Sequence, residues 1–186
     1  MILEIVRKSR SYRRFDTSVK ISRAELLSMV EAARLSPCAG NHQALRFAII
    51  NDEKTANAVF NTLAFAAYLK DWNGPAESER PVAYIVVMLD SDLTANRAID
   101  AGIAAQSMLL RASELGYGGC MFRSFDRERL DKLLDRAPYR AELVIALGKP
   151  SENVEIVDFC GDIKYYRDEN DTHCVPKLSL DELIID

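Results

Sequence analysis

The stretch from 82 to 89, VAYIVVML, constrains the fold of this chain more than any other feature. β-Branched residues favour extended backbone, and a strand that is apolar on both faces must be covered on both sides. The run LRFAII at 45–50 has the same character, so we expect a second strand that is buried on both faces. Two such strands indicate a layered fold in which helices cover a sheet.

Predicted helices alternate with these strands along the chain. The best marked is ISRAELLSMVEAARLSP, in which Ser22 and Glu25 form a capping box and a Ser-Pro pair ends the helix. Further helices are expected at 53–70, 92–115 and 126–134, and further strands in GGCMF and ELVIALG. This alternation predicts an α/β or α+β layered fold, and 186 residues are ample for one domain with one core.

Three other stretches suggest a partner or a moving part. The helix expected at 92–115 is apolar over most of its length, so it lies centrally in the domain or is buried against a partner. The polar residues after 160 have a turn at DEND and little core of their own, which favours a hairpin and an extended arm on another surface, or a frayed terminus. The turn-rich connection at 69–81 is a candidate lid.

The composition is that of an ordinary soluble globular protein, with a net charge of −4 and no long basic tract, which argues against general nucleic-acid binding. We expect no membrane segment, because no apolar run approaches the roughly 20 residues of a spanning helix. The N-terminal charges follow the apolar residues, unlike those of a signal peptide. The four cysteines form no C-x-x-C pair, so we expect neither a disulfide framework nor a zinc site, and a cytoplasmic location.

Several enzyme classes lack their motifs in this sequence. The chain contains no H-E-x-x-H, no G-x-S-x-G and no phosphate-binding G-x-x-x-x-G-K-[ST]. We expect Gly116 to end the helix predicted at 92–115 as a C-terminal glycine. The GYGG at 116–119 thus follows a helix instead of opening one, so it is not a dinucleotide-binding fingerprint. His42 and His173 are the only histidines, and we expect structural roles for both.

The segment SRSYRRFD at 9–16 gathers Arg10, Arg13 and Arg14 in an acidic chain. One interpretation is a solvated helix end with ion pairs. The other is a phosphate site, because guanidinium groups match phosphate with paired donors and Ser11 adds a hydroxyl. If this segment is helical, Arg10 and Arg13 share one face.

Two loop segments suit a flat ligand. SPCAGNHQALRF at 36–47 has small residues that let a ligand approach the backbone, and Asn41 and Gln43 could bond the edge of a planar heterocycle; the alternative is a plain helix–strand loop. GYGGCMFRSFD at 116–126 offers soft apolar side chains, or is a tight turn into a core strand. A reactive role for Cys38 is not favoured, since the sequence puts no evident general base near it.

Taken in order, these segments resemble the flavin-dependent nitroreductase family. SRSYRRF is similar to the family's R-R-S-x-R-x-F, and SPCAGNHQALRF to S-P-S-x-x-N-x-Q-P-W-x-F. GYGGCMFRSF is similar to G-L-G-T-C-W-x-G-G-F, and VPKLSLDELI to a basic C-terminal segment. Each motif alone is weak, but their order and spacing agree over nearly the whole chain.

The resemblance implies an α+β fold, a three-layer α/β/α sandwich with a central mixed sheet flanked by helices. It implies one domain over 1–186, in which 160–186 is an extension exchanged with the partner of a homodimer and 92–115 builds the dimer core. Two FMN sites would lie at the subunit interface. The activity implied is a cytoplasmic FMN-dependent oxidoreductase that takes hydride from NADH or NADPH.

The electron acceptor implied by the resemblance is an electron-poor small molecule, such as a nitroaromatic or a quinone, reduced in a ping-pong cycle. Two alternatives stay open: a non-catalytic flavin carrier or sensor, and a dehalogenase or flavin-destroying branch of the same fold. No catalytic side chain is expected, because the cofactor carries the chemistry at its N5 atom.

The resemblance also implies the cofactor-binding residues. Arg10 and Ser11 would hold the phosphate with help from Lys177, and Arg13 would lie at the pyrimidine edge, where its charge tunes the flavin. Arg14 is expected to be a surface ion-pair partner. The partner subunit would contribute Pro37, Cys38, Ala39 and Asn41, with Gln43 nearby, and the residues close to the reactive ring would be Met121, Arg123 and Ser124.

This sequence departs from the family pattern at several places. Ser9 stands where the family has its first arginine, Cys38 where it has serine, and Ala44-Leu45 where it has Pro-Trp. The pair Arg123-Ser124 replaces Gly-Gly, so we expect a narrower substrate pocket or an added positive charge in it.

Overall fold

The strand β3 (Ala83–Asp90) occupies the middle of the main sheet in the computed structural model, which describes residues 1–66, 68–69, 72–90 and 97–185. β3 pairs on one side with β2 (Leu45–Ile50) and on the other with β5 (Tyr139–Pro150). β4 (Gly118–Phe122) and the short β1 (Phe15–Asp16) lie along the far side of β5. These strand pairs are antiparallel, and a parallel bridge joins Ser11 to Gly119 beyond β4.

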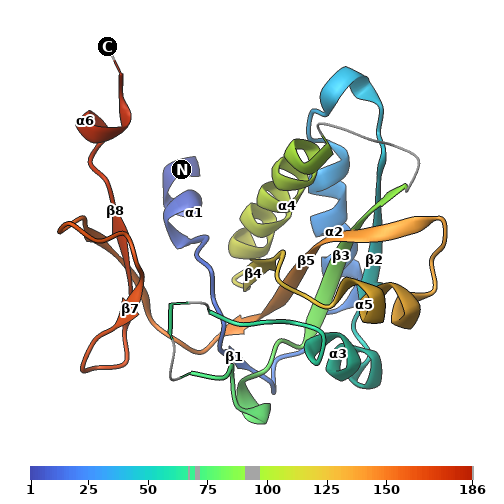
Figure 1. Cartoon of the computed structure of the whole chain (residues 1–186), viewed down its shortest axis with the longest axis horizontal. Helices are drawn as coiled ribbons and strands as arrows, with labels where there is room; N and C mark the ends of the chain where they lie inside the picture. The colour runs from blue at the N-terminus through green and yellow to red at the C-terminus, as the bar shows by residue number, and fades with distance from the viewer. Residues whose placement is uncertain (67, 70–71, 91–96, 186) are drawn as a thin grey trace.

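Helices cover both faces of this sheet, as Figure 1 shows. α2 (Arg23–Arg34) and α4 (Arg97–Glu114) pack on one face, and α3 (Glu53–Phe60) and α5 (Arg127–Leu134) pack on the other. The predicted α+β fold with three layers is therefore confirmed.

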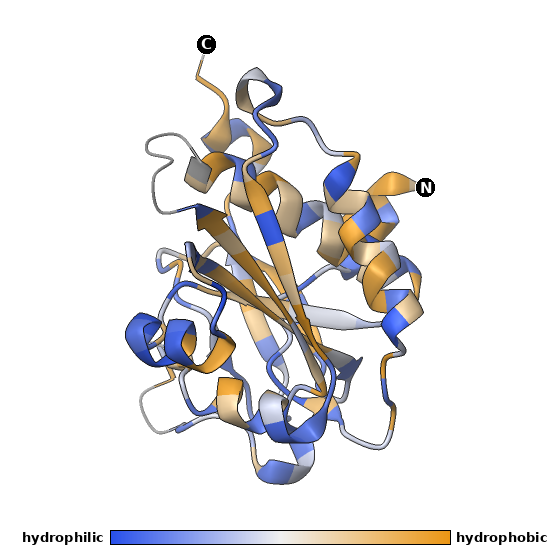
Figure 2. Ribbon diagram, turned by 90° about the vertical axis from the view of Figure 1, so that its right-hand side faces the viewer, coloured by the Kyte–Doolittle hydropathy of each residue, from blue (hydrophilic) through white to orange (hydrophobic). Residues whose placement is uncertain are grey.

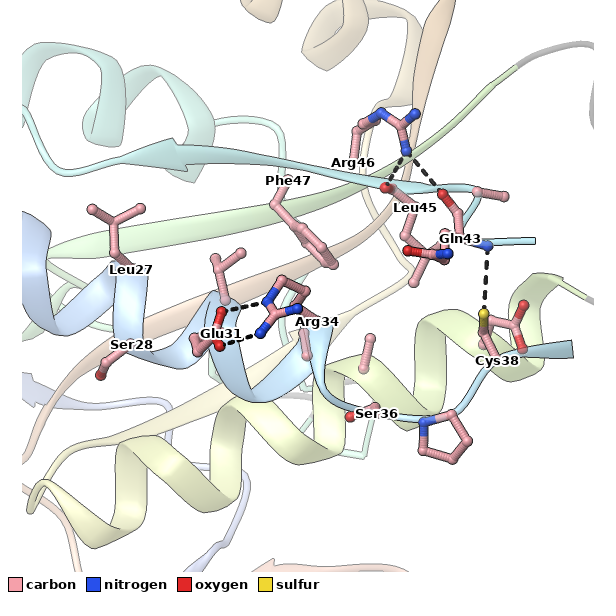
Figure 3. A pocket seen from close by; sticks show the side chains of 16 residues that line it. Leu27, Ser28, Glu31, Arg34, Ser36, Cys38, Gln43, Leu45, Arg46 and Phe47 are labelled. Carbon is pink, nitrogen blue, oxygen red and sulfur yellow. Dashed lines mark hydrogen bonds and ion pairs between the residues drawn. The ribbon is translucent and has the colours of Figure 1, made fainter. Parts of the chain in front are cut away.

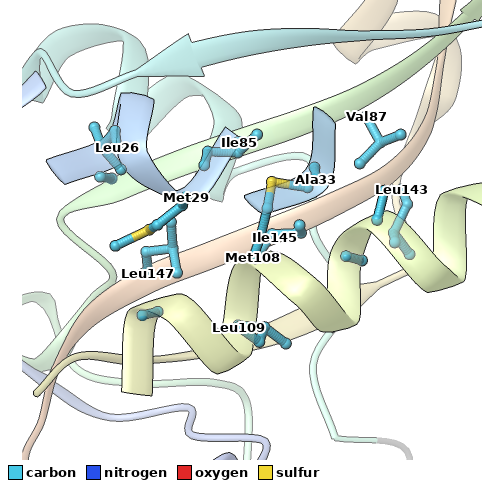
Figure 4. Packing of buried hydrophobic residues seen from close by; sticks show 14 of the residues in the cluster. Leu26, Met29, Ala33, Ile85, Val87, Met108, Leu109, Leu143, Ile145 and Leu147 are labelled. Atoms are coloured by element: carbon cyan, nitrogen blue, oxygen red, sulfur yellow. The ribbon is translucent and has the colours of Figure 1, made fainter. Parts of the chain in front are cut away.

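The core follows from the alternation of side chains along β3. Ile85 and Val87 belong to the cluster beneath α2 and α4, which Figure 4 shows, while Tyr84 and Val86 belong to the cluster beneath α3 and α5. Each of these side chains is fully buried, which confirms the prediction for 82–89. Burial of one such apolar side chain stabilises the fold by about 1.5–3 kcal/mol.

Several local predictions are confirmed in detail. The hydroxyl of Ser22 accepts a hydrogen bond from the Glu25 amide at 3.2 Å, and the Glu25 carboxylate accepts one from the Ser22 amide at 2.8 Å. Gly116 lies two residues after the end of α4, as the predicted C-terminal glycine, and its φ of +80° is a conformation that favours glycine. α4 begins at Arg97 in the described residues, and the start expected at 92 lies outside them.

Two predictions about elements are wrong. The helix expected at 53–70 ends at Phe60, because the chain beyond it pairs with another segment: the Ala64 amide donates to the Ser124 carbonyl at 2.9 Å, and Leu63 bridges Phe125. The strand at 45–50 is only half-buried over most of its length, since β2 is an edge strand.

The N-terminal helix α1 (Ile2–Lys8) ends before the arginine segment, so residues 9–14 are not helical. The prediction that Arg10 and Arg13 share one face of a helix is therefore wrong. Short 3-10 turns occur at η1 (Ala39–Asn41) and η2 (Glu77–Glu79).

The C-terminal residues form a second, smaller sheet, which stands apart from the main sheet in Figure 1. β8 (His173–Lys177) is its middle strand, between β6 (Val154–Asp158) and β7 (Tyr166–Arg167). β7 and β8 form the expected hairpin, and the short helix α6 (Leu180–Leu183) follows. The ribbon near the C-terminus is coloured as hydrophobic in Figure 2. The apolar side chains at this end of the chain are exposed: Leu180, Leu183, Ile184 and Ile185.

Candidate functional site

The arginine segment is held in extended form along β4. The Tyr12 amide donates a hydrogen bond to the Gly119 carbonyl at 3.0 Å, beside the bridge between Ser11 and Gly119. A Cβ atom at Gly118 would lie 2.4 Å from the Tyr12 ring, too close for any side chain. The glycines of GYGG therefore provide a close packing surface for the arginine segment, and this packing fixes where Arg10 and Arg13 lie.

A cavity of about 270 Å³ opens between this segment, α4, β4 and the C-terminal sheet. We call it the arginine cavity. Five of the expected cofactor-binding residues line it: Arg10, Ser11, Arg13, Met121 and Lys177. Six further lining residues were not predicted: Ser9, Gln106, Leu109, Tyr165, His173 and Val175.

The positive charges of the arginine cavity lack carboxylate partners. Arg13 is only 9% exposed, and its Nη1 atom donates to the Ser11 carbonyl at 3.2 Å. Its guanidinium also stacks on the Tyr165 ring at 4.8 Å. Arg10 donates to the Val6 carbonyl at 2.8 Å, and neither arginine nor Lys177 makes an ion pair with any residue that the structure describes. None of the described residues that line this cavity is an aspartate or a glutamate.

Arg13 is buried and has no ion pair within the described residues, which is unfavourable, so an anion in the arginine cavity would stabilise it. The Nε atoms of both Arg10 and Arg13 are buried and have no hydrogen-bond partner within the described parts of the chain. Buried donors of this kind are normally satisfied, so a ligand that is rich in acceptor atoms fits them. Such a ligand would also remove the cost of the uncompensated charge.

The neighbouring cations differ, because carboxylates already pair with them. Arg14 pairs with Asp171 and lies 3.7 Å from a carboxylate oxygen of Glu79, which confirms that it is an ion-pair partner. Arg167 donates to the buried carboxylate of Glu152 at 2.6 Å. The other oxygen of Glu152 accepts hydrogen bonds from the backbone amides of Arg13 and Arg14, so Glu152 holds the segment while leaving the Arg13 guanidinium unpaired.

His173 lies against Arg13 at the wall of the arginine cavity. Its side chain is 1% exposed, and its Nε2 atom is 3.2 Å from Nη1 of Arg13. Burial and, after it, the positive charge of Arg13 lower the pKa of His173 to about 4. The imidazole is therefore neutral near pH 7.

The segment around 37–43 lies elsewhere, at a second cavity of about 680 Å³ between α2 and β2 (Figure 3). Pro37, Cys38 and Gln43 line this second cavity, and Ala39 and Asn41 belong to the adjacent turn η1. Within one chain the structure therefore does not bring these five residues to the arginine cavity.

The loop at 37–43 has an unusual backbone that the fold holds in place. Gly40, Asn41 and Gln43 have φ values of +56°, +52° and +49°. The Ala39 amide donates to the buried carboxylate of Asp100 on α4 at 3.0 Å, and the Gln43 amide donates to Sγ of Cys38 at 3.4 Å. Left-handed backbone at non-glycine residues is costly and clusters at functional sites.

Arg123 and Ser124 follow β4 and do not line the arginine cavity. Arg123 is 65% exposed and pairs with Glu142 at 2.8 Å, so its charge is already compensated. The Ser124 carbonyl accepts the hydrogen bond from Ala64. Met121 is the member of this group that reaches the cavity.

Sequence reasoning missed Gln106, Tyr165 and His173. A signal for His173 was available, because β8 alternates its side chains: His173, Val175 and Lys177 share one face and all line the arginine cavity. Every second residue before Lys177 on this strand lies on the same face, and this period leads to Val175 and then to His173.

The layered fold and the arginine segment packed on β4 agree with the comparison of the sequence with known families. The model of the nitroreductase family matches residues 6–149, and the chain belongs to this family of oxidoreductases. In the described residues, no helix has both the length and the apolar character needed to cross a bilayer.

Individual relatives agree with this family. A Bacillus subtilis (strain 168) protein, "Putative NAD(P)H nitroreductase YdgI", is 25% identical over 81% of this chain and 88% of its own length. A nitroreductase family protein from Streptococcus pneumoniae TIGR4 superposes over 100% of both chains with a TM-score of 0.71 and 19% identity. An FMN-dependent nitroreductase from Clostridium difficile R20291 covers 81% of this chain and 88% of its own, with a TM-score of 0.65 and 21% identity.

Proposed function

We propose that this protein is an FMN-dependent oxidoreductase that takes hydride from NADH or NADPH and reduces an electron-poor acceptor, such as a nitroaromatic or a quinone, in a ping-pong cycle. The observation that carries the proposal is the arginine cavity, where Arg10, Arg13 and Lys177 have no ion pair in the described part of the chain. The names of the relatives support the choice of FMN and NAD(P)H.

The residues present fit the phosphate of FMN. Arg10 and Lys177 supply charge, Ser11 supplies a hydroxyl, and the buried Nε of Arg10 lacks a partner among described residues. Guanidinium groups bind phosphate oxygens with paired, charge-assisted hydrogen bonds. Ser9 cannot add a second guanidinium, so Arg10 carries more of the phosphate binding than one arginine of a pair would.

Arg13 fits the pyrimidine edge of the flavin. Arg13 would hold the pyrimidine edge of bound FMN, which would supply the hydride-accepting N5 atom and the electrons for the acceptor. Arg13 is fixed by the Ser11 carbonyl and the Tyr165 ring, so its charge needs no rearrangement when negative charge grows beside it. A preorganised cation in a water-poor site stabilises that charge more strongly than a mobile one.

We also propose that the complete site needs two copies of the chain. The arginine cavity, at about 270 Å³, is below the roughly 300–1,000 Å³ of typical ligand pockets, and the loop at 37–43 lies at a different cavity. A second copy would supply Pro37, Cys38, Ala39 and Asn41, with Gln43 nearby. Ile99 and Ile103 on the outer face of α4 are 64% and 37% exposed, which suits an apolar dimer core.

In this proposal, residues 1–186 form one domain, and 160–186 extend onto the partner subunit. The exposed apolar residues after Ser179 favour such an arm over a solvated terminus. Sedimentation at micromolar concentration should find a flavin-loaded dimer. A folded monomer that retains flavin would contradict the two-chain site.

The test of the function begins with the visible spectrum of the purified protein, since bound oxidised flavin absorbs near about 450 nm. FMN is then titrated into the flavin-free protein, and NADH and NADPH oxidation is followed with and without a quinone acceptor. Turnover with parallel lines in double-reciprocal plots supports the proposal. Tight FMN binding without oxidation of either nicotinamide would favour a carrier or sensor, and absence of FMN binding would refute the function.

A further inference from the structure

We propose that His173 is a further binding residue of the flavin site, which accepts a hydrogen bond from Arg13 at Nε2 and donates one from Nδ1 to the flavin ring or its ribityl chain. The inference rests on the proposed function, because it concerns the same cavity. It assigns a binding role to a histidine for which the sequence had predicted a structural one.

The geometry with Arg13 fixes where the imidazole proton lies. Nε2 of His173 is 3.2 Å from Nη1 of Arg13, and a guanidinium can only donate hydrogen bonds. Nε2 must therefore be the acceptor, which assigns the proton of the neutral ring to Nδ1. The contact with Arg13 thus turns Nδ1 into a hydrogen-bond donor.

That donor has no partner within the described residues. Nδ1 is buried, the side chain as a whole is 1% exposed, and the residue lines the arginine cavity. A buried donor that lacks an acceptor costs about 1–3 kcal/mol, so nearly all such groups in folded proteins are satisfied. An acceptor atom in the cavity would remove this cost.

The groups around His173 keep this arrangement stable. Tyr165 packs beside the ring with 5.1 Å between centroids, and the same Tyr165 ring carries the Arg13 guanidinium. Among charged groups, Arg13, Arg14 and Arg167 oppose protonation of the imidazole and Glu152 favours it, and burial adds to the effect of the arginines. His173 therefore stays a neutral donor over the ordinary pH range.

The position of His173 selects the part of the cofactor that it contacts. Lys177 shares a face of β8 with His173 but lies four residues further on, roughly 13 Å along an extended strand. Arg13 touches His173, and Arg13 is the residue proposed for the pyrimidine edge. We therefore assign Nδ1 of His173 to the flavin or ribityl portion of the cofactor, and Lys177 to the phosphate.

The test compares FMN with riboflavin, which lacks the phosphate, by fluorescence titration of the flavin-free protein. His173→Phe keeps the ring shape and removes both nitrogen atoms, and it should weaken binding of both flavins about tenfold, the loss expected for one buried hydrogen bond. His173→Gln retains one acceptor and one donor and should stay within about threefold of the parent. Lys177→Ala should weaken FMN binding and leave riboflavin binding unchanged.

Unchanged affinity of His173→Phe for both flavins would overturn the inference, and a loss confined to FMN would move His173 to the phosphate and overturn the assignment. If the parent protein binds neither flavin, the proposed function itself fails. Should His173→Phe not fold, ¹⁵N-histidine labelling of the parent decides, because the chain has only two histidines and His42→Gln assigns their signals. The Nδ1–H signal of His173 should shift on addition of FMN; an unmoved signal refutes the hydrogen bond.

Discussion

Arg13→Gln is the most informative single substitution in this protein. Arg13 is 9% exposed, has no ion pair within the described residues, and is held by the Ser11 carbonyl, His173 and Tyr165. Glutamine keeps hydrogen-bonding capacity and removes the charge. In the proposed site, the substitution therefore isolates the electrostatic effect of Arg13 on the reduced flavin.

The burial of Arg13 sets the size of this effect. With an effective dielectric constant of about 20, a unit charge at about 5 Å contributes about 3 kcal/mol, whereas at a water-exposed site it would contribute below about 1 kcal/mol. Because about 30 mV corresponds to about 1.4 kcal/mol for a two-electron couple, we expect Arg13→Gln to lower the midpoint potential of bound FMN by about 60–70 mV. Reduction by NAD(P)H should become slower as well.

Spectroelectrochemical titration of the flavin measures this potential directly. Arg14→Gln is the matched control, because it removes a neighbouring charge that Asp171 and Glu79 already compensate. The control should lower stability and leave the potential nearly unchanged. A larger shift for Arg14 than for Arg13, or no shift for either, would refute the assignment of Arg13 to the flavin.

Three further predictions concern the framework of the site. Gly118→Ala should destabilise the protein by about 1–3 kcal/mol in thermal unfolding and weaken FMN binding, because the new Cβ would lie 2.4 Å from the Tyr12 ring; unchanged affinity would contradict the role of GYGG as a packing surface. Glu152→Ala should cost about 1–3 kcal/mol in urea unfolding, since it removes one of the two carboxylate partners of Arg167 and frees two backbone amides. The pKa of His173 is about 4 when folded and about 6.5 when unfolded, so the unfolded chain binds the proton first as the pH falls. The neutral imidazole therefore contributes about 3 kcal/mol to the free energy of unfolding above pH 6.5, and this contribution should be lost between pH 6.5 and 4. In His173→Gln this loss of stability should be absent.

The elements that the sequence predicted well are those whose signals are local. The run VAYIVVML, the capping box of Ser22 and Glu25, and the glycine at 116 each determine backbone geometry within a few residues. The helix expected at 53–70 failed because Ala64 pairs with Ser124, a partner sixty residues away. Periodicity along a segment carries no information about such a distant partner.

The candidate site likewise contains residues that the sequence predicted and residues that it did not. Motif order found Arg10, Ser11 and Lys177, which come together in one cavity although they are far apart in the chain. It did not find Tyr165 or His173, because their importance arises from contact with Arg13 and not from their own neighbours in sequence. Arg123, which the resemblance places near the flavin, pairs with Glu142 and does not line the arginine cavity within one chain.

An acidic chain can keep a cationic cavity only if its carboxylates are engaged elsewhere. Around the arginine cavity, Glu152 binds Arg167 and two backbone amides, and Asp171 binds Arg14. Both carboxylates therefore stabilise the segment that carries Arg13 without neutralising Arg13 itself. This separation explains the three arginines of SRSYRRFD: Arg14 ties the segment to the C-terminal hairpin, and this leaves Arg10 and Arg13 available for an anionic ligand.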